Sequence, residues 1–172
     1  MRKIILGIAA TAAIAAPLAV AGTASATPAP AGKATGSVTW DFNHGQVTGQ
    51  VIFNANAKTG GTLDYQASNG MWLHGVVTAS SYHQIDADTA VFAGEITSGS
   101  DDYTVHHAGT DYFSVKVVDG GTSGRNGDMI AVLANMDGNG QWLTGPNADT
   151  TVDYPMTPAT AGIVTGGNLT IH

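Results

Sequence analysis

The chain has 172 residues, with six Lys and Arg, 13 Asp and Glu, six His and no Cys, and its formal net charge is −7. This length suits a single domain, and without cysteine no disulfide can stabilise it. An acidic chain with so few cations cannot neutralise a run of phosphates, which disfavours binding to nucleic acid or anionic lipid.

The first 26 residues have the features of a secretory signal peptide. Cations at positions 2 and 3 precede an apolar stretch over residues 4–20, and Ala-Ser-Ala at 24–26 gives the small-x-small cleavage pattern. We therefore expect a helical signal peptide over residues 1–26, cleaved after Ala26, and a secreted, extracellular protein of bacterial origin. A membrane anchor is the alternative, which Pro17 and the Ala-rich composition disfavour.

Cleavage would leave four cations against 13 acidic residues, a net charge of −9. No second long apolar segment follows, so we expect no membrane association after cleavage. Residues 27–35, rich in Pro, Ala and Thr, indicate a flexible lead-in, and one domain is expected over 36–172.

From Gly36 onward, short runs rich in Val, Ile, Thr, Tyr and Phe alternate with Gly, Asn, Asp and Ser clusters, a pattern typical of strands joined by turns. We expect strands at Ser37–Phe42, Gln46–Ala55, Gly61–Ala67, Met71–Ala79, Ser81–Ile85, Ala90–Ile96, Tyr103–Val105, Tyr112–Val118, Met129–Ala134 and Gly167–Ile171.

Several of these runs alternate with period two. In Tyr112–Val118, Phe113, Val115 and Val117 share one face, as in an antiparallel sheet that is buried on one side. The pattern predicts an all-β domain, an antiparallel β-sandwich or open barrel of about nine or ten short strands. The long irregular stretch over residues 146–162 predicts a loop, and loops of this length are often functional.

Several motifs occur in a fixed order across residues 34–172, and the more specific ones lie in the second half. They include Gly-Ser-Val-Thr-Trp at 36–40, Val-Asp-Gly at 118–120 before Gly-Asp at 127–128, and the closing Gly-Gly-Asn-Leu-Thr-Ile-His at 166–172. In this order the chain resembles a family of small β-modules of secreted bacterial proteins, which occur alone or appended to larger exported proteins. The resemblance implies the β-fold and secretion, and it implies no activity or ligand.

Catalytic motifs are few. Nucleophilic catalysis needs a Ser or Cys beside a positioned base, and the chain has neither Cys nor Gly-x-Ser-x-Gly. Glu95 is the single glutamate, which disfavours a glutamate pair for glycoside hydrolysis. We predict no catalytic residue and rank a secreted hydrolase below a binding role.

Zinc and calcium are the two candidate metal cofactors. Zinc would need three or four converging ligands, which the six histidines could supply if they meet in space: His44, His74, His83, His106, His107 and His172. Calcium could bind oxygen side chains at alternate positions of the Gly-containing loop 135–140, with Asp137 and Asn139 as ligands. In both cases the simpler interpretation is structural, with hydrogen-bonded strand histidines and a β-turn.

Exposed aromatic side chains can stack on sugars or on protein partners. Trp142 follows a polar turn and precedes the 146–162 loop, so we predict it as a binding residue together with Tyr154. Trp40 and Trp72 are expected in the core. The favoured function is a secreted, non-catalytic module that binds an extracellular glycan, another polymer or a protein. The alternative is self-association through edge strands, because few lysines would block them.

Overall fold

The structure is a computed structural model and describes residues 32–100, 111–121, 127–136 and 143–172. Within these ranges the chain forms strands, two short 3-10 segments and no α-helix. The elements are β1 Lys33–Phe42, β2 Val47–Asn56, β3 Gly60–Ala67, β4 Trp72–Val77, η1 Ala79–Ser81, β5 His83–Gln84, β6 Thr89–Gly99, β7 Tyr112–Val118, β8 Met129–Ala134, η2 Asp149–Thr151 and β9 Gly162–Ile171.

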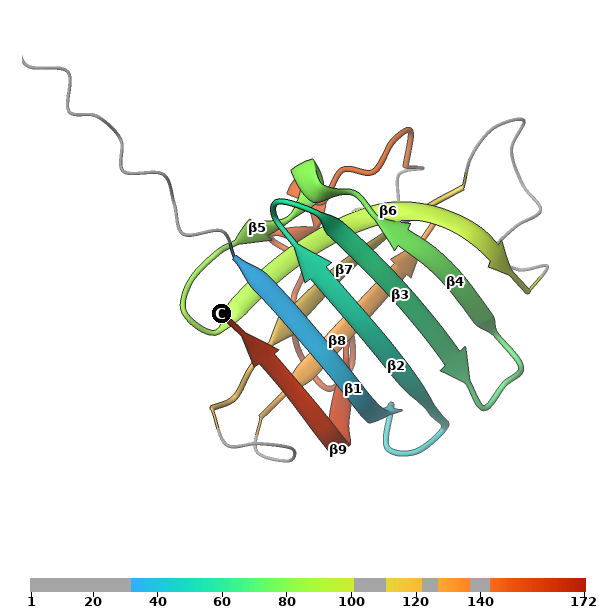
Figure 1. Ribbon diagram of the computed structural model, residues 1–172. Coiled ribbons are helices and arrows are strands. Elements are labelled where there is room, and N and C mark those ends of the chain that lie inside the picture. The colour runs from blue at the N-terminus through green and yellow to red at the C-terminus, as the bar shows by residue number, and fades with distance from the viewer. Residues whose placement is uncertain (1–31, 101–110, 122–126, 137–142) are drawn as a thin grey trace, which may run out of the picture.

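Eight of the strands close into an antiparallel barrel (Figure 1). Their order around the barrel is β4-β3-β2-β1-β9-β8-β7-β6, and β6 returns to pair with β4. The strand β5 pairs with β6 and lies outside this ring. The strands β1 to β4 form the wall that faces the viewer in Figure 1, and β7 and β8 lie behind it.

The long, curved strand β6 makes the closure. Its first seven residues, Thr89–Glu95, pair with β7, and its last part pairs with β4, where Gly94 lies opposite Val77. A Cβ atom at Gly94 would lie 2.0 Å from the carbonyl oxygen of Val76 and 2.7 Å from Cζ of Phe113. Glycine at this position therefore lets β4 and β6 approach each other while the Phe113 ring fills the space beneath them.

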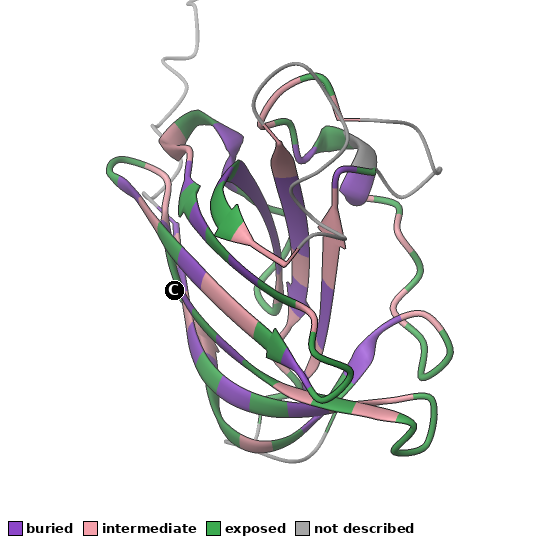
Figure 2. Ribbon diagram, turned by 90° about the vertical axis from the view of Figure 1, so that its right-hand side faces the viewer, coloured by how far each residue is buried: buried purple, intermediate pink, exposed green. Residues whose placement is uncertain are grey.

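Alternate residues of each strand point into the barrel, which gives the striped burial pattern of Figure 2. In β2, Val51 and Phe53 are buried, whereas Gln50 and Ile52 are exposed. The rings of Phe53 and Phe92 meet across the interior with centroids 5.4 Å apart. The largest fully buried apolar side chains are Phe92, Phe113, Leu63, Leu73, Val38, Val51, Val91, Val115, Val117 and Val164.

A serine side chain is hydrogen-bonded to β6 between the part of β6 that pairs with β4 and the part that pairs with β5. The hydroxyl of the buried Ser81 accepts a hydrogen bond from the Ala93 N–H at 2.9 Å. It lies 2.6 Å from the Ala93 carbonyl oxygen and 2.7 Å from that of Thr78, and can donate to either. Ser81 thus takes the place of a backbone ladder partner where the chain leaves the sheet.

The predicted 146–162 loop packs on the outer face of β7. Thr151 Oγ1 donates a hydrogen bond to Ser114 Oγ at 2.8 Å, and both side chains are buried. Lys116 Nζ donates to the carbonyl oxygens of Val152, at 2.5 Å, and Tyr154, at 2.9 Å. The loop therefore forms an outer layer over one side of the barrel.

The structure confirms the all-β, antiparallel prediction, and β7 and β8 have the predicted bounds. The prediction of a sandwich or an open barrel is wrong in its architecture, because β4 pairs with β6 and closes the sheet. The predicted lead-in is wrong for Lys33–Thr35, which pair with β2, and Ala34 is fully buried. The signal peptide and the predicted strand Tyr103–Val105 lie outside the described residues.

The described part of the chain contains no helix with the length and apolar character that a membrane span requires.

We predict that Ser81→Ala lowers the free energy of unfolding by about 1–3 kcal/mol, because the buried Ala93 N–H would lose its partner, whereas the Ala93 carbonyl keeps the Thr78 N–H. Urea denaturation followed by circular dichroism measures this. The matched control is Ser37→Ala, an exposed serine of β1, which should stay within about 0.5 kcal/mol of the wild type. Equal losses in the two variants would contradict the bridging role of Ser81.

We predict that Gly94→Ala lowers the free energy of unfolding by about 1–3 kcal/mol or more, because its methyl group would collide with backbone at the joint between β4 and β6. Thermal unfolding measures the loss. The control Gly145→Ala adds a methyl group that meets nothing within 4 Å. A melting temperature of Gly94→Ala equal to that of the control would show that the joint is not tightly packed.

Candidate functional site

Half of the predicted binding and metal residues lie outside the described part of the chain. These are Trp142, Asp137 and Asn139, together with His106 and His107. The structure places Tyr154 in the outer loop, where it is half-buried and its hydroxyl donates to the Thr160 carbonyl oxygen at 3.1 Å. Tyr154 therefore has a structural hydrogen bond and also borders a cavity that is described below.

In the described residues, no three His, Asp or Glu side chains come together as metal ligands. His74 lies beside Asp64, and His83 Nε2 lies 3.3 Å from Asp149 Oδ1. The side chain of Asn135, the first residue of the predicted calcium loop, accepts a hydrogen bond from the Tyr112 N–H at 3.3 Å. Zinc and calcium binding both stay predictions, and neither enters the site described here.

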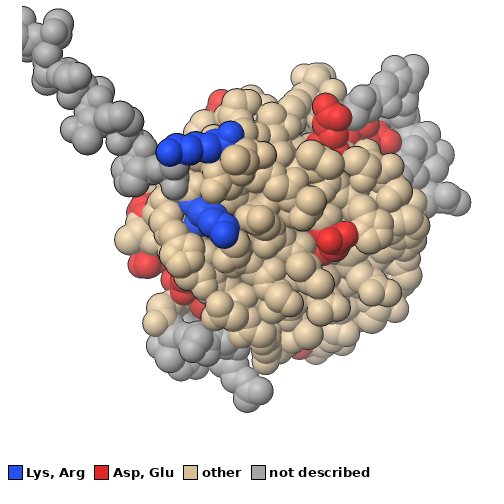
Figure 3. All heavy atoms as spheres, in the orientation of Figure 1, with Lys and Arg blue, Asp and Glu red and all other residues tan. Residues whose placement is uncertain are grey.

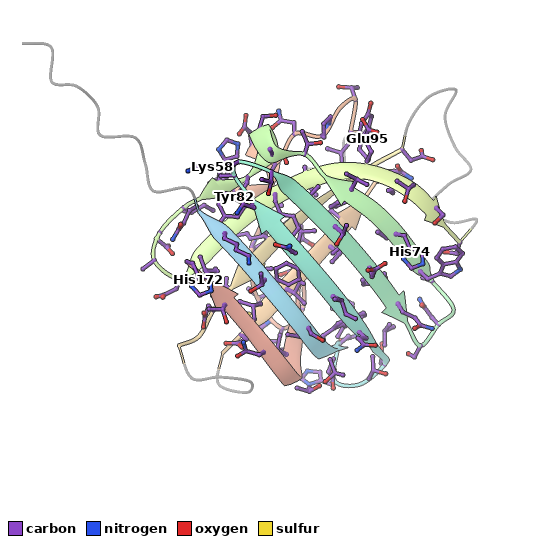
Figure 4. The ribbon with its side chains drawn as sticks, in the orientation of Figure 1. Lys58, His74, Tyr82, Glu95 and His172 are labelled. Atoms are coloured by element: carbon purple, nitrogen blue, oxygen red, sulfur yellow. The ribbon has the colours of Figure 1, made fainter. Side chains whose placement is uncertain are left out.

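The isolated acid Glu95 is exposed on β6, opposite Val76 and Tyr112 of the neighbouring strands (Figure 4). At the upper end of the barrel, the buried Tyr82 hydroxyl has no hydrogen-bond partner in the described residues. Burial raises the pKa of Tyr82 above its usual 10.0, so its hydroxyl stays protonated at neutral pH. Neither residue forms an acid pair or an activated nucleophile.

The exposed tryptophan of the described structure is Trp72, the first residue of β4. Its side chain is 37% exposed, whereas Trp40 is 6% exposed and stacks on Tyr65 inside the barrel. The core prediction is therefore confirmed for Trp40 and wrong for Trp72. The reason is strand alternation, because Leu73 points inward and places Trp72 and His74 on the outer face.

Trp72 and five other outward side chains form two neighbouring rows across β2, β3 and β4, and we call this set of six the Trp72 platform. One row contains Gln50, Gln66 and Trp72, and the next contains Ile52, Asp64 and His74. With strands about 4.8 Å apart, three of them give a surface about 10 Å wide. Together with Tyr65, these residues line a shallow groove of about 440 Å³.

Within the platform, His74 is held in place from two sides. Its ring centroid lies 5.2 Å from that of Trp72, and its Nδ1 is hydrogen-bonded to Asp64 Oδ1. Because a carboxylate accepts, Nδ1 carries the proton and donates. The Nε2 atom of the same ring lies on the outer side of β4, where Figure 4 shows His74, and can form a hydrogen bond with a ligand there.

The barrel wall formed by β1 to β4 carries little charge. Uncharged atoms cover most of this face in Figure 3, and charged atoms lie mainly near its edges. The outward residues of β2 are Thr48, Gln50, Ile52, Asn54 and Asn56, which are neutral. The platform therefore offers an aromatic surface, amides and one carboxylate, which is a hydrogen-bonding surface rather than an ionic one.

No family model, no curated protein and no solved structure matches this chain. The geometry and chemistry of the chain's own residues therefore define the candidate site.

We predict that Trp72→Ala lowers the free energy of unfolding by less than half as much as Trp40→Ala. Trp40 is packed in the core, where truncation of a tryptophan costs about 3–5 kcal/mol. Urea denaturation of the two variants gives the comparison. If Trp72→Ala is as destabilising as Trp40→Ala, Trp72 belongs to the packing of the fold and not to an exposed platform.

Proposed function

We propose that the exported chain is a non-catalytic module that binds a glycan chain on the Trp72 platform. The observation that carries this proposal is the exposed indole of Trp72 beside His74, in a groove whose other side chains are mainly amides and a carboxylate. The predicted signal peptide and the resemblance to secreted bacterial β-modules are part of the proposal, since both agree with an extracellular polymer as ligand.

A sugar ring has an apolar C–H face and a rim of hydroxyl groups, and the platform suits both. The flat indole of Trp72 can stack on the apolar face of the sugar. Its ring is apolar and its N–H group is polar, and side chains of this kind are common at binding surfaces. Gln50 and Gln66 each have one acceptor and two donors, and Asp64 is an acceptor. Hydroxyl groups donate and accept in turn, so this mixed set can satisfy several neighbouring hydroxyls.

Other partner classes fit the platform less well. A nucleic acid would need Lys or Arg for its phosphates, and none lies among the platform residues. A standard protein interface covers about 800 Å² on each partner around an apolar core, whereas polar side chains predominate here. Self-association through strand edges is less favoured, because closure of the barrel pairs β4 with β6. Of the strand edges that stay unpaired in the described residues, those of β5 and of Ala131–Ala134 in β8 are short.

A non-catalytic role is favoured by the surroundings of Asp64. Its carboxylate is engaged by His74, and no third acidic or His side chain joins them among the described residues. Retaining and inverting glycosidases use two carboxyl groups on either side of the scissile bond. The platform has a single one, so we assign Asp64 to orienting His74 and to accepting from a ligand hydroxyl.

We predict that the protein is retained on at least one of insoluble cellulose, chitin and peptidoglycan, and that Trp72→Ala weakens this binding by about tenfold or more, which is about 1.4 kcal/mol. Depletion assays on the three polymers, with bound protein measured against free, give the affinities. Gln50→Ala and Gln66→Ala should each weaken binding by a smaller factor.

The matched control is Val76→Ala, which truncates an exposed side chain on the same face of β4 but outside the groove. Binding by this variant should equal that of the wild type. The proposal fails if the folded wild type binds none of the three polymers, or if Trp72→Ala and Val76→Ala bind equally well.

A further inference from the structure

A second cavity, of about 310 Å³, lies beside β8 at the end of the barrel where β1 ends and β2 begins. Aromatic and aliphatic side chains from β1, β2, β3 and β8 line it, and Tyr154 and Thr160 of the outer loop border it. This cavity does not include Trp72, His74 or the glutamines of the Trp72 platform. It is therefore a separate candidate site.

The barrel wall is weakly paired beside the cavity. The strands β8 and β9 share only two residue pairs, Met129 with Ile163 and Ile130 with Gly162. In the described part of the chain, Ala131–Ala134 have no partner on β9, although the whole of β8 pairs with β7. Tyr154 and Thr160 of the outer loop line the cavity together with this unpaired edge.

Side chains that point inward at this end of the barrel are only half-buried. They are Phe42, Val47, Tyr65 and Val132, all of which pack against the core cluster. Deeper in the barrel, Phe53, Phe92 and Phe113 are buried and fill the interior. The space is therefore a blind apolar pocket and not a channel through the barrel.

One wall of the pocket is flat. Trp40 and Tyr65 stack with ring centroids 5.6 Å apart and an interplanar angle of 15°, and both residues line the cavity. The Trp40 indole nitrogen itself is buried, so the wall presents ring surface to the pocket and not the N–H donor.

From these features we propose that the pocket binds a small, planar, mainly apolar molecule. Its volume is at the lower end of the range of about 300–1,000 Å³ for small-molecule sites, so a long acyl chain would not fit. The stacked pair of Trp40 and Tyr65 selects a flat ring.

The test uses the exported form of the chain and 1-anilinonaphthalene-8-sulfonate (ANS), a probe with a flat, apolar naphthalene ring, followed by its fluorescence. We expect saturable binding of one probe per chain, and a shift of the Trp40 indole N–H resonance in NMR spectra, assigned with Trp40→Phe. Val132→Phe, which fills the pocket from β8, should weaken binding about tenfold or more, equal to 1.4 kcal/mol. Val76→Phe, on the outer face of β4, is the control and should bind as the wild type does.

ANS also binds partly unfolded states, so near-ultraviolet circular dichroism and cooperative unfolding must be intact in each sample. The proposal is overturned if the folded wild type does not bind, or if the indole resonance of Trp40 does not move on binding. It is also overturned if Val132→Phe folds and binds as the wild type does. Trp72→Ala keeps this result separate from glycan binding, because it should leave probe binding unchanged. Loss of probe binding in Trp72→Ala alone would place the probe on the platform and reject the pocket.

Discussion

The pairing of β4 with β6 is the constraint on which the rest of the structure depends. Without this pairing the sheet would be open, with β4 at one edge. With it the sheet is a closed barrel that has an interior and an outer surface. With no cysteine in the chain, ladder hydrogen bonds and interior packing must hold this joint. Gly75 and Gly94 leave room for it, since a Cβ at Gly75 would lie 2.3 Å from the Phe113 ring. The Phe113 ring thereby fills the core directly beneath the joint.

Closure also decides which side chains are available to a ligand. The outer face of β7 is covered by the 146–161 segment, which buries Ser114 and Thr151 and engages Lys116. On the opposite wall, the outward side chains of β2, β3 and β4 include the exposed Gln50, Ile52 and Trp72. The same alternation that packs Leu73 into the core therefore places Trp72 and His74 on an accessible surface. The alternation of β4 therefore both packs the core and positions the candidate site.

The sequence predicted the strands well because alternation is a local property. Phe113, Val115 and Val117 were expected on one face, and all three are fully buried. The burial of Ser114 on the other face depends on a loop almost 40 residues away in sequence, which no local pattern reports. The closure of the sheet is equally non-local. The exposure of Trp72, in contrast, follows from a local pattern. Leu73, Gly75 and Val77 alternate on the inner face, so Trp72 lies on the outer face, and its predicted place in the core did not follow this alternation.

The two candidate sites lie on opposite sides of one strand. Tyr65 of β3 lines both the outer groove and the inner pocket, and it pairs with Val51 on one side and Leu73 on the other. Because packed walls transmit changes in shape, a substitution at Tyr65 would alter both sites together. Side chains that border one site alone, Trp72 outside and Val132 inside, are therefore the ones that can separate them. Independent responses at those two positions would mean that β2 and β3, which contribute to both sites, present a polar recognition surface outward and an apolar one inward.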